Sequence, residues 1–104
     1  MSRRDRPPTH PGAVLREDVL PALGVSVAQA ARDLGVSRQL LHGILRTDRP
    51  ETPEMALRLA RYCGNQAQFW LNMQVNHDLW RARRAMSGKL SRIPPHRSVA
   101  GPAR

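Results

Sequence analysis

Apolar residues recur at three- and four-residue spacing from Thr9 to Trp80, and this spacing predicts helices and no strand. Between the helical segments stand Ser, Thr, Pro and Gly, the residues that commonly begin and end helices. The first helix is expected to begin near His10 and Pro11, because proline is tolerated in a first turn, and to stop before Pro21. The whole pattern predicts an all-α fold of five helices.

The second and third predicted helices are short and closely linked. Ser26 caps the second helix, which ends at Leu34 before Gly35, and Ser37 caps the third, which runs to about Arg46. Their inner faces and the corner between them are apolar: Ala30, Ala31, Leu34, Val36, Leu41, Ile44 and Leu45. Two short helices that pack crosswise about a glycine turn form a helix-turn-helix, a motif that many proteins use to read DNA.

The fourth predicted helix opens at Thr52 and Pro53 and closes before Gly64. Its core face consists of Ala56, Leu59, Ala60 and Cys63. Because 104 residues with 40% hydrophobic content suit one small domain, we expect a single domain over residues 9–85. The flanks at 1–8 and 86–104 are rich in Pro, Gly, Ser and Arg, and we expect both to be flexible.

The fifth predicted helix, which Asn65 can cap, carries apolar residues on two faces. One stripe consists of Phe69, Met73 and Trp80, with Trp70 at its margin. The opposite stripe consists of Leu71, Val75, Leu79 and Ala82. A helix cannot bury two such stripes against one small bundle, so we expect one stripe to meet the domain and the other to form a homodimer interface. We assign the dimer to the second stripe, although the pattern leaves the choice of stripe open. The alternative is a helix sunk between neighbours of its own chain.

The formal charge of +9 is concentrated outside the expected domain. From Thr9 to Trp80 seven Arg stand against seven acidic residues, so this part is formally neutral. Three Arg and one Asp precede it, and six Arg and one Lys follow it. A basic tail can follow nucleic-acid phosphates, whereas many such charge runs are simply solvated, and the sequence leaves both interpretations open.

Several other classes of protein are disfavoured. No apolar run approaches the roughly 18 residues of a membrane-spanning helix, and the basic N-terminus lacks the apolar core of a secretory signal. We therefore expect a cytoplasmic protein. The lone Cys63 cannot form an internal disulfide, so nothing in the sequence calls for an oxidising compartment. The spacing of His10, His77 and His96 shows neither close pairing nor cysteine partners. With no catalytic or phosphate-loop motif present, we expect no enzyme, no metal and no cofactor.

The third helix is the expected recognition helix, which enters the major groove of double-stranded DNA with its N-terminal turns. Its outward positions are Ser37, Arg38, Gln39, Leu40, His42, Gly43 and Arg46. Arg38 can donate two hydrogen bonds to guanine, and Gln39 can pair with adenine. No acidic residue occurs from Leu34 to Thr47 to repel phosphate.

Further residues around this helix suit the DNA backbone. Gln29 and Ser37 lie near the starts of the two helices, where phosphate oxygens commonly bind. Arg46 and Arg49 are placed to reach the backbone or a base at the edge of the site. For His42 a DNA contact and an exposed position without a role explain the residue equally well. A dimer would present two recognition helices about one DNA turn apart, which suits a palindromic operator.

Four segments together resemble the HigA family of antitoxins. They are Thr9-His-Pro-Gly, Leu34-Gly-Val-Ser-Arg-Gln, Thr52-Pro-Glu-Met-Ala-Leu-Arg-Leu-Ala60, and Phe69-Trp-Leu-Asn-Met-Gln with Asp78-Leu-Trp80. The resemblance covers residues 9–84 and implies a lambda-repressor-like fold of the Xre-type regulators. It also implies a homodimer that represses its own operon and neutralises a HigB toxin, a small RelE-like ribonuclease that acts on messenger RNA at the ribosome.

Two departures from the family pattern affect the recognition helix. The family commonly has Asn-Gly where this chain has Arg46-Thr47, so we expect a different or strained exit from the helix, eased by Asp48. Gly43 stands where relatives carry a side chain. It indicates either that something approaches the backbone closely or that base readout is thinner here.

Three other functions compete with an autoregulating antitoxin. The first is a solitary Xre-type regulator without a toxin partner. The second is a protein-binding module that masks a toxin, with DNA binding secondary or lost. The third is a non-specific nucleic-acid binder driven by the basic tail, which would leave the helix-turn-helix without a task.

Overall fold

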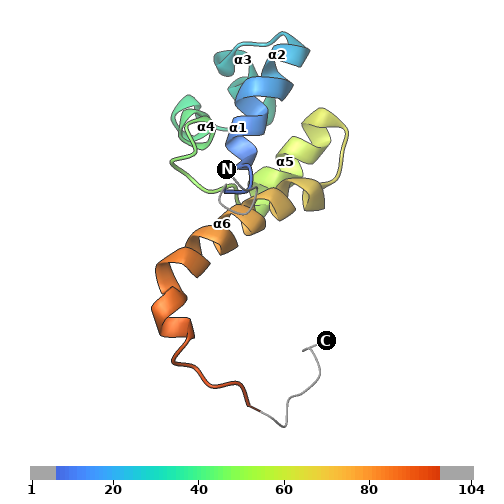
Figure 1. The fold of residues 1–104 in the computed structure, drawn as a ribbon. Coiled ribbons are helices and arrows are strands. Elements are labelled where there is room, and N and C mark those ends of the chain that lie inside the picture. Colours follow the sequence, from blue (N-terminus) through green and yellow to red (C-terminus); the bar gives the residue numbers. More distant parts are fainter. Residues whose placement is uncertain (1–6, 97–104) are drawn as a thin grey trace.

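A computed structural model describes residues 7–96, and this part of the chain is helical without any strand. The expected all-α fold is therefore confirmed. The helices lie in two groups (Figure 1): the first four predicted helices form a globular body, and the last one packs beneath it and then projects away.

The first helix runs without interruption from Pro11 to Leu23, past the proline that was expected to end it. It consists of α1 (Pro11–Val14), a π-helical stretch η2 (Leu15–Val19) and α2 (Leu20–Leu23). The expectation of a stop before Pro21 was wrong because the π-helical stretch bonds the Leu20 N–H to the Leu15 carbonyl, five residues back. This widened turn makes room for Pro21, which has no backbone N–H and whose ring crowds the preceding turn.

The helix-turn-helix is present as predicted. Helix α3 (Val27–Leu34) begins at Ser26, whose Oγ accepts from the Gln29 N–H at 3.1 Å, and ends at Gly35. Helix α4 (Arg38–Leu45) begins at Ser37, whose Oγ accepts from the Leu40 N–H at 3.0 Å. Side-chain acceptors at these positions satisfy N–H groups that a helix itself leaves without partners.

Helix α5 (Pro53–Cys63) follows the predicted bounds, with Thr52 as its cap. Helix α6 (Ala67–Leu90) extends five residues past the expected domain boundary at 85. Asn65 does not cap it: the Asn65 Oδ1 accepts instead from the Trp70 indole N–H at 2.8 Å, and Gln66 stands at the cap position without a side-chain bond. The flanks expected to be flexible include residues 1–6 and 97–104, which lie outside the described residues.

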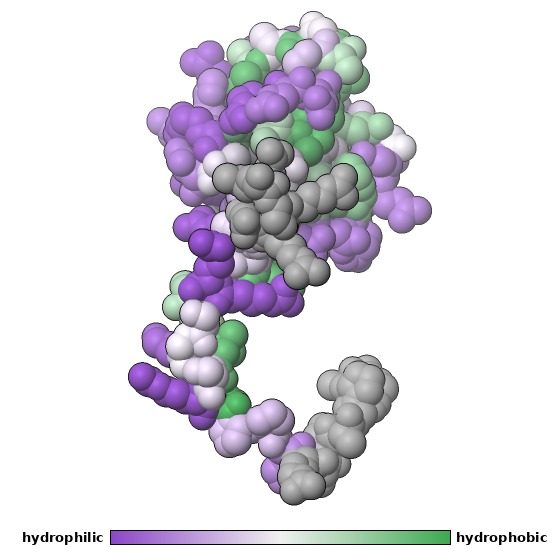
Figure 2. Space-filling model, viewed as in Figure 1, coloured by the Kyte–Doolittle hydropathy of each residue, from purple (hydrophilic) through white to green (hydrophobic). Residues whose placement is uncertain are grey.

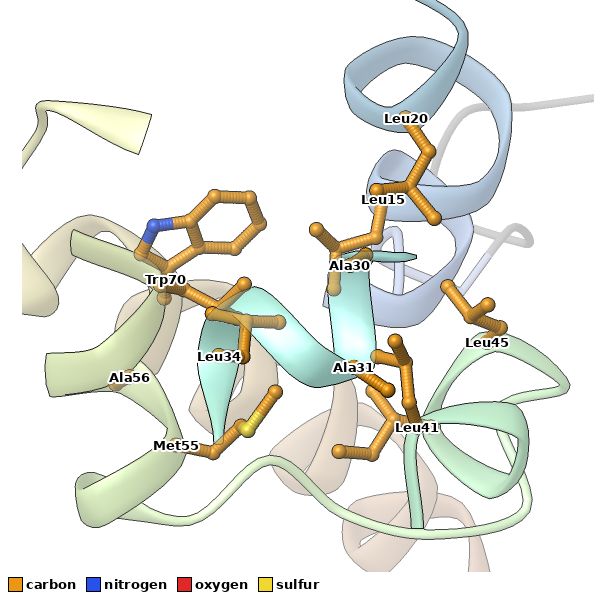
Figure 3. Close-up of a cluster of buried hydrophobic side chains, with 12 residues drawn as sticks. Leu15, Leu20, Ala30, Ala31, Leu34, Leu41, Leu45, Met55, Ala56 and Trp70 are labelled. Atoms are coloured by element: carbon orange, nitrogen blue, oxygen red, sulfur yellow. The ribbon is translucent and has the colours of Figure 1, made fainter. Parts of the chain in front are cut away.

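The hydrophobic core surrounds α3 (Figure 3). Its buried side chains come from every helix: Leu15, Leu20, Ala30, Ala31, Leu34, Leu41, Ile44, Leu45, Met55, Ala56, Leu59 and Trp70. The small Ala30 and Ala31 let neighbouring helices approach α3 closely. Trp70 is fully buried, whereas Phe69 is 49% exposed, so α6 meets the core through Trp70, which the sequence pattern placed only at the margin of a stripe.

Backbone packing fixes the recognition helix against the first helix. A Cβ added at Gly12 would lie 1.7 Å from the Ile44 carbonyl oxygen, so only glycine permits this approach. Beside it, the Arg16 guanidinium donates to the Leu45 carbonyl at 2.7 Å. From the other side of the motif, the Arg58 guanidinium donates to the Leu34 carbonyl at 2.7 Å. Both arginines thus bind carbonyls at helix C-termini, where cations are favoured.

Candidate nucleic-acid interface

The N-terminal half of α4 presents polar side chains to solvent. Arg38, Gln39 and His42 are exposed, while Leu41 and Ile44 on the opposite side are buried. Leu40 is half-buried, so it contributes less to the outer surface than predicted. Within residues 7–96 neither Arg38 nor Gln39 has a hydrogen bond or an ion pair with another side chain. Their donors and acceptors are therefore available to a ligand, with no internal contact to break.

The two residues expected to bind phosphate are partly engaged within the protein. The Ser37 Oγ caps α4, but its own hydroxyl proton is still available to donate. The Gln29 amide donates to Asp33 Oδ1 at 2.7 Å and accepts from the Arg32 guanidinium at 2.8 Å. Because Asp33 and Arg32 already occupy this amide, Gln29 is a weaker candidate for a phosphate contact than its place near the start of α3 indicated.

Gly43 is not an outward position, because the Arg49 side chain covers it. A Cβ at Gly43 would lie 2.7 Å from the Arg49 Cδ and 3.0 Å from its Cγ. Of the two explanations for this glycine, close approach of another group is therefore the one that the structure shows. The Gly43 carbonyl also accepts from the N–H groups of Asp48 and Arg49, at 2.9 and 3.2 Å. These contacts hold the stem of Arg49 against α4, while the residue as a whole remains exposed.

The exit from α4 is strained, as predicted. Thr47 has φ of 62°, the one positive φ at a non-glycine residue in the described part of the chain. A β-branched residue in this conformation costs about 1–2 kcal/mol relative to its ordinary backbone regions. Asp48 follows with a salt bridge from its Oδ2 to the Arg46 Nε at 3.0 Å. Arg46 is thus exposed beside α4, but its charge is partly offset by this pair.

A pair of histidines supports the loop after α4. The His10 Nδ1 caps α1 by accepting from the Gly12 N–H at 2.9 Å, and His10 lines a cavity together with Arg49. The His77 ring packs edge-on against the His10 ring, with 5.0 Å between the ring centres, a contact between residues far apart in the sequence. Burial, followed by the nearby His77, lowers the pKa of His10 and keeps it in the neutral form that can accept a hydrogen bond.

Glu51 is a buried carboxylate that the sequence analysis did not single out. It is 3% exposed, and within residues 7–96 neither of its carboxylate oxygens has a hydrogen-bond partner. Its backbone N–H donates to the Gln74 side chain at 2.7 Å, which ties the loop to α6. Burial raises the pKa of Glu51 from its ordinary 4.5 to about 7. An isolated acidic residue beside a proline carries no periodic signal, so no pattern could have revealed this burial.

The predicted dimer stripe on α6 is largely exposed. Val75 and Leu79 are 51% and 43% exposed, Ala82 is exposed, and Leu71 is half-buried. Phe69 on the other stripe is also exposed. In Figure 2 both apolar and hydrophilic side chains reach the surface along the projecting part of α6. The helix therefore keeps apolar surface that its own domain does not cover.

Comparison with known proteins identifies the class of this fold. A family model described as "Helix-turn-helix domain" matches residues 3–68. Virulence-associated protein I of Dichelobacter nodosus is 44% identical over 77 residues, 74% of this chain and 71% of that protein. The chain thus belongs to the helix-turn-helix DNA-binding regulators and, among them, to the HigA antitoxin family.

Two solved structures support this assignment. "Pseudomonas aeruginosa antitoxin HigA with higBA promoter" has a TM-score of 0.80 at 38% identity, over 85% of this chain and 97% of that one. An addiction module antidote protein of a HigA family from Coxiella burnetii has a TM-score of 0.81 at 32% identity, over 88% of this chain and 100% of that one. The prediction that this chain is not an enzyme agrees with such a family of DNA-binding regulators.

Within residues 7–96 no three His, Cys, Asp or Glu side chains are grouped as a metal site requires. The helices of the same part of the chain lack an apolar stretch of the length that a membrane-spanning helix needs. Cys63 is half-buried, and burial raises the pKa of its thiol, which favours the unreactive protonated form.

Glu51→Gln is expected to stabilise the protein at alkaline pH. The folded-state pKa of Glu51 lies above its unfolded value, so the protonated carboxyl favours folding at low pH, and this contribution is lost as pH rises from 4.5 to about 7. At pH 8 the free energy of unfolding should be about 3 kcal/mol higher for the variant than for the parent chain. At pH 5 this difference should be less than about 1 kcal/mol. Urea unfolding followed by circular dichroism at both pH values measures the difference.

The exposed Glu54 provides the matched control. Glu54→Gln breaks a surface pair with Arg58 and should change the stability by less than about 1 kcal/mol at either pH. Equal stability of Glu51→Gln and the parent chain at pH 8 would show that the carboxylate is not isolated from water.

Proposed function

We propose that this protein is a sequence-specific transcriptional repressor that serves as the antitoxin of a HigB/HigA-type toxin–antitoxin system. The observation that carries the proposal is the exposed and unpartnered polar surface at the start of α4, in a fold similar to an antitoxin HigA solved with its promoter. Arg38 would read guanine and Gln39 adenine in the major groove. Ser37, Arg46, Arg49 and, more weakly, Gln29 would hold the phosphate backbone, with His42 beside them.

Repression would be steric and would require two copies of the chain. A homodimer through Leu71, Val75, Leu79 and Ala82 would present two recognition helices to a palindromic operator. An occupied operator that overlaps the promoter of its own operon would exclude RNA polymerase. Such a protein acts where the chromosome is, in the bacterial cytoplasm.

Neutralisation of a toxin would be the second task of the same chain. The toxin that HigA relatives imply is a HigB-type, RelE-like ribonuclease acting on messenger RNA. The runner-up is a solitary Xre-type regulator, and it is favoured by relatives described simply as HTH-type transcriptional regulators, such as YbaQ of Escherichia coli, 35% identical over 86 residues.

Arg38→Ala and Gln39→Ala should each weaken recognition of the DNA upstream of the gene by about 5- to 150-fold, because each removes a base contact worth roughly 1–3 kcal/mol. Affinity for a scrambled duplex should change much less. Fluorescence anisotropy with both duplexes measures the ratio of the affinity for the upstream duplex to that for the scrambled duplex. Arg61→Ala, which removes an exposed cation from α5, should leave the ratio intact. An unchanged ratio in both α4 variants would refute the assigned reading surface.

Val75→Glu combined with Leu79→Glu should convert the dimer into a monomer of 11.7 kDa, since burying two carboxylates at an apolar interface is costly. Light scattering after gel filtration gives the mass, and circular dichroism checks that the helices persist. Phe69→Glu, at an equally exposed position of the opposite stripe, should remain dimeric. Dissociation by Phe69→Glu alone would move the interface to that stripe.

Co-expression tests the antitoxin role. If a small basic reading frame adjoins the gene, its product alone should arrest growth, and the present chain should restore growth and co-purify with it. The Arg38→Ala, Gln39→Ala double variant should still restore growth, because its defect is confined to DNA reading. Failure of the unmodified chain to restore growth would favour the solitary regulator.

A further inference from the structure

The second half of α6 lies outside the globular body. Gln74 is the last buried side chain of this helix, and every residue from Arg81 to Leu90 is exposed. At 1.5 Å per residue the 24 residues of α6 span about 36 Å, so the exposed part projects well beyond the domain (Figure 1). A segment whose residues are all exposed in the described part of the chain is free to contact a partner.

This projecting segment is strongly cationic. Its positively charged residues and those just beyond it are Arg81, Arg83, Arg84, Lys89 and Arg92, and no acidic residue follows Asp78. None of these five takes part in a salt bridge within residues 7–96. Arg81 and Arg84 are three residues apart on one helix face, where like charges repel each other. An external anion would relieve this repulsion.

Arg81 lies beside the loop that leaves the recognition helix. It lines a cavity of about 290 Å³ together with Thr47, Arg49 and His77. His10 lines the same cavity, so Arg49 and Arg81 meet around one hollow at the end of α4. The basic face of α6 is therefore continuous with the edge of the surface that α4 and its following loop form.

The acidic residues at this cavity are already engaged. Asp48 pairs with Arg46, and Asp78 accepts from the Gln74 amide at 3.0 Å. Arg84 lies one turn beyond Arg81, with its guanidinium 4.7 Å from the centre of the Trp80 ring. Stacking of this kind restricts the arginine while its donors remain exposed.

We propose that Arg81 and Arg84 contact the phosphate backbone of the bound DNA and extend the footprint of each chain beyond the recognition helix. The proposal rests on the operator binding proposed above. Nucleic acid fits better than an acidic protein surface, because these arginines continue a surface that already holds Arg46, Arg49 and the exposed start of α4. Phosphate contacts fix position and carry no sequence information, so their loss should weaken binding to all duplexes alike.

The salt dependence of DNA binding tests the proposal. The full-length Arg81→Gln, Arg84→Gln variant is titrated with the upstream duplex and with a scrambled duplex at several KCl concentrations. Each lost phosphate contact should reduce the slope of log affinity against log salt by about 0.9, so the slope should fall by about 2 per bound chain. Affinity at low salt should fall at least tenfold on both duplexes, with their ratio unchanged. The Arg81→Lys, Arg84→Lys variant should retain the parental slope.

A charge-matched variant separates contact from net charge. Arg61→Gln with Arg83→Gln removes two exposed cations, one on α5 and one that lies about 200° around α6 from Arg81, and its slope should equal that of the parent chain. The proposal is overturned if the Arg81→Gln, Arg84→Gln variant has the same slope as the parent chain. It is also overturned if the Arg61→Gln, Arg83→Gln variant loses as much slope as the Arg81→Gln, Arg84→Gln variant. If the parent chain shows no preference for the upstream duplex, the proposed repressor function fails, and the slopes on the scrambled duplex still decide whether these arginines meet phosphate.

Discussion

The orientation of the recognition helix depends on close backbone packing at its C-terminal end. The first helix approaches so closely that the Ile44 carbonyl occupies the space of a side chain at Gly12. The next carbonyl, that of Leu45, accepts from Arg16. Helix C-termini leave carbonyls without internal partners, and here a neighbouring helix supplies the donor. The C-terminal end of α4 is therefore held by the protein, and its N-terminal end is left exposed for a ligand.

The other helix of the motif is held in the same way. Arg58 of α5 donates to the Leu34 carbonyl, and the Tyr62 hydroxyl donates to Asp33 Oδ2 at 2.7 Å. Because α3 also lies at the centre of the core, the angle between α3 and α4 is set by contacts with the first helix and with α5 (Figure 3). DNA recognition demands such rigidity, since base contacts require side chains positioned within fractions of an ångström.

Local signals predicted the helices well, and tertiary contacts account for the differences. Ser26, Ser37 and Thr52 cap the helices that they were expected to cap, because capping depends on a few neighbouring residues. The continuation past Pro21 depends on a π-helical turn, which no apolar spacing encodes. On α6 the inner face passes from Trp70 to the polar Gln74 and His77, so a search for apolar stripes could not identify the buried face. Similarly, the apolar pattern predicted that the start of α4 is exposed. It could not predict that Arg49 covers Gly43, because this contact depends on the course of the loop after α4.

The two departures from the family pattern have one structural explanation. Thr47 takes a left-handed conformation at a cost of about 1–2 kcal/mol, and this reverses the chain so that the N–H groups of Asp48 and Arg49 reach the Gly43 carbonyl. The absence of a side chain at Gly43 then leaves room for Arg49 to lie against α4. The strain at Thr47 is therefore coupled to a defined position for the Arg49 side chain against Gly43 of α4.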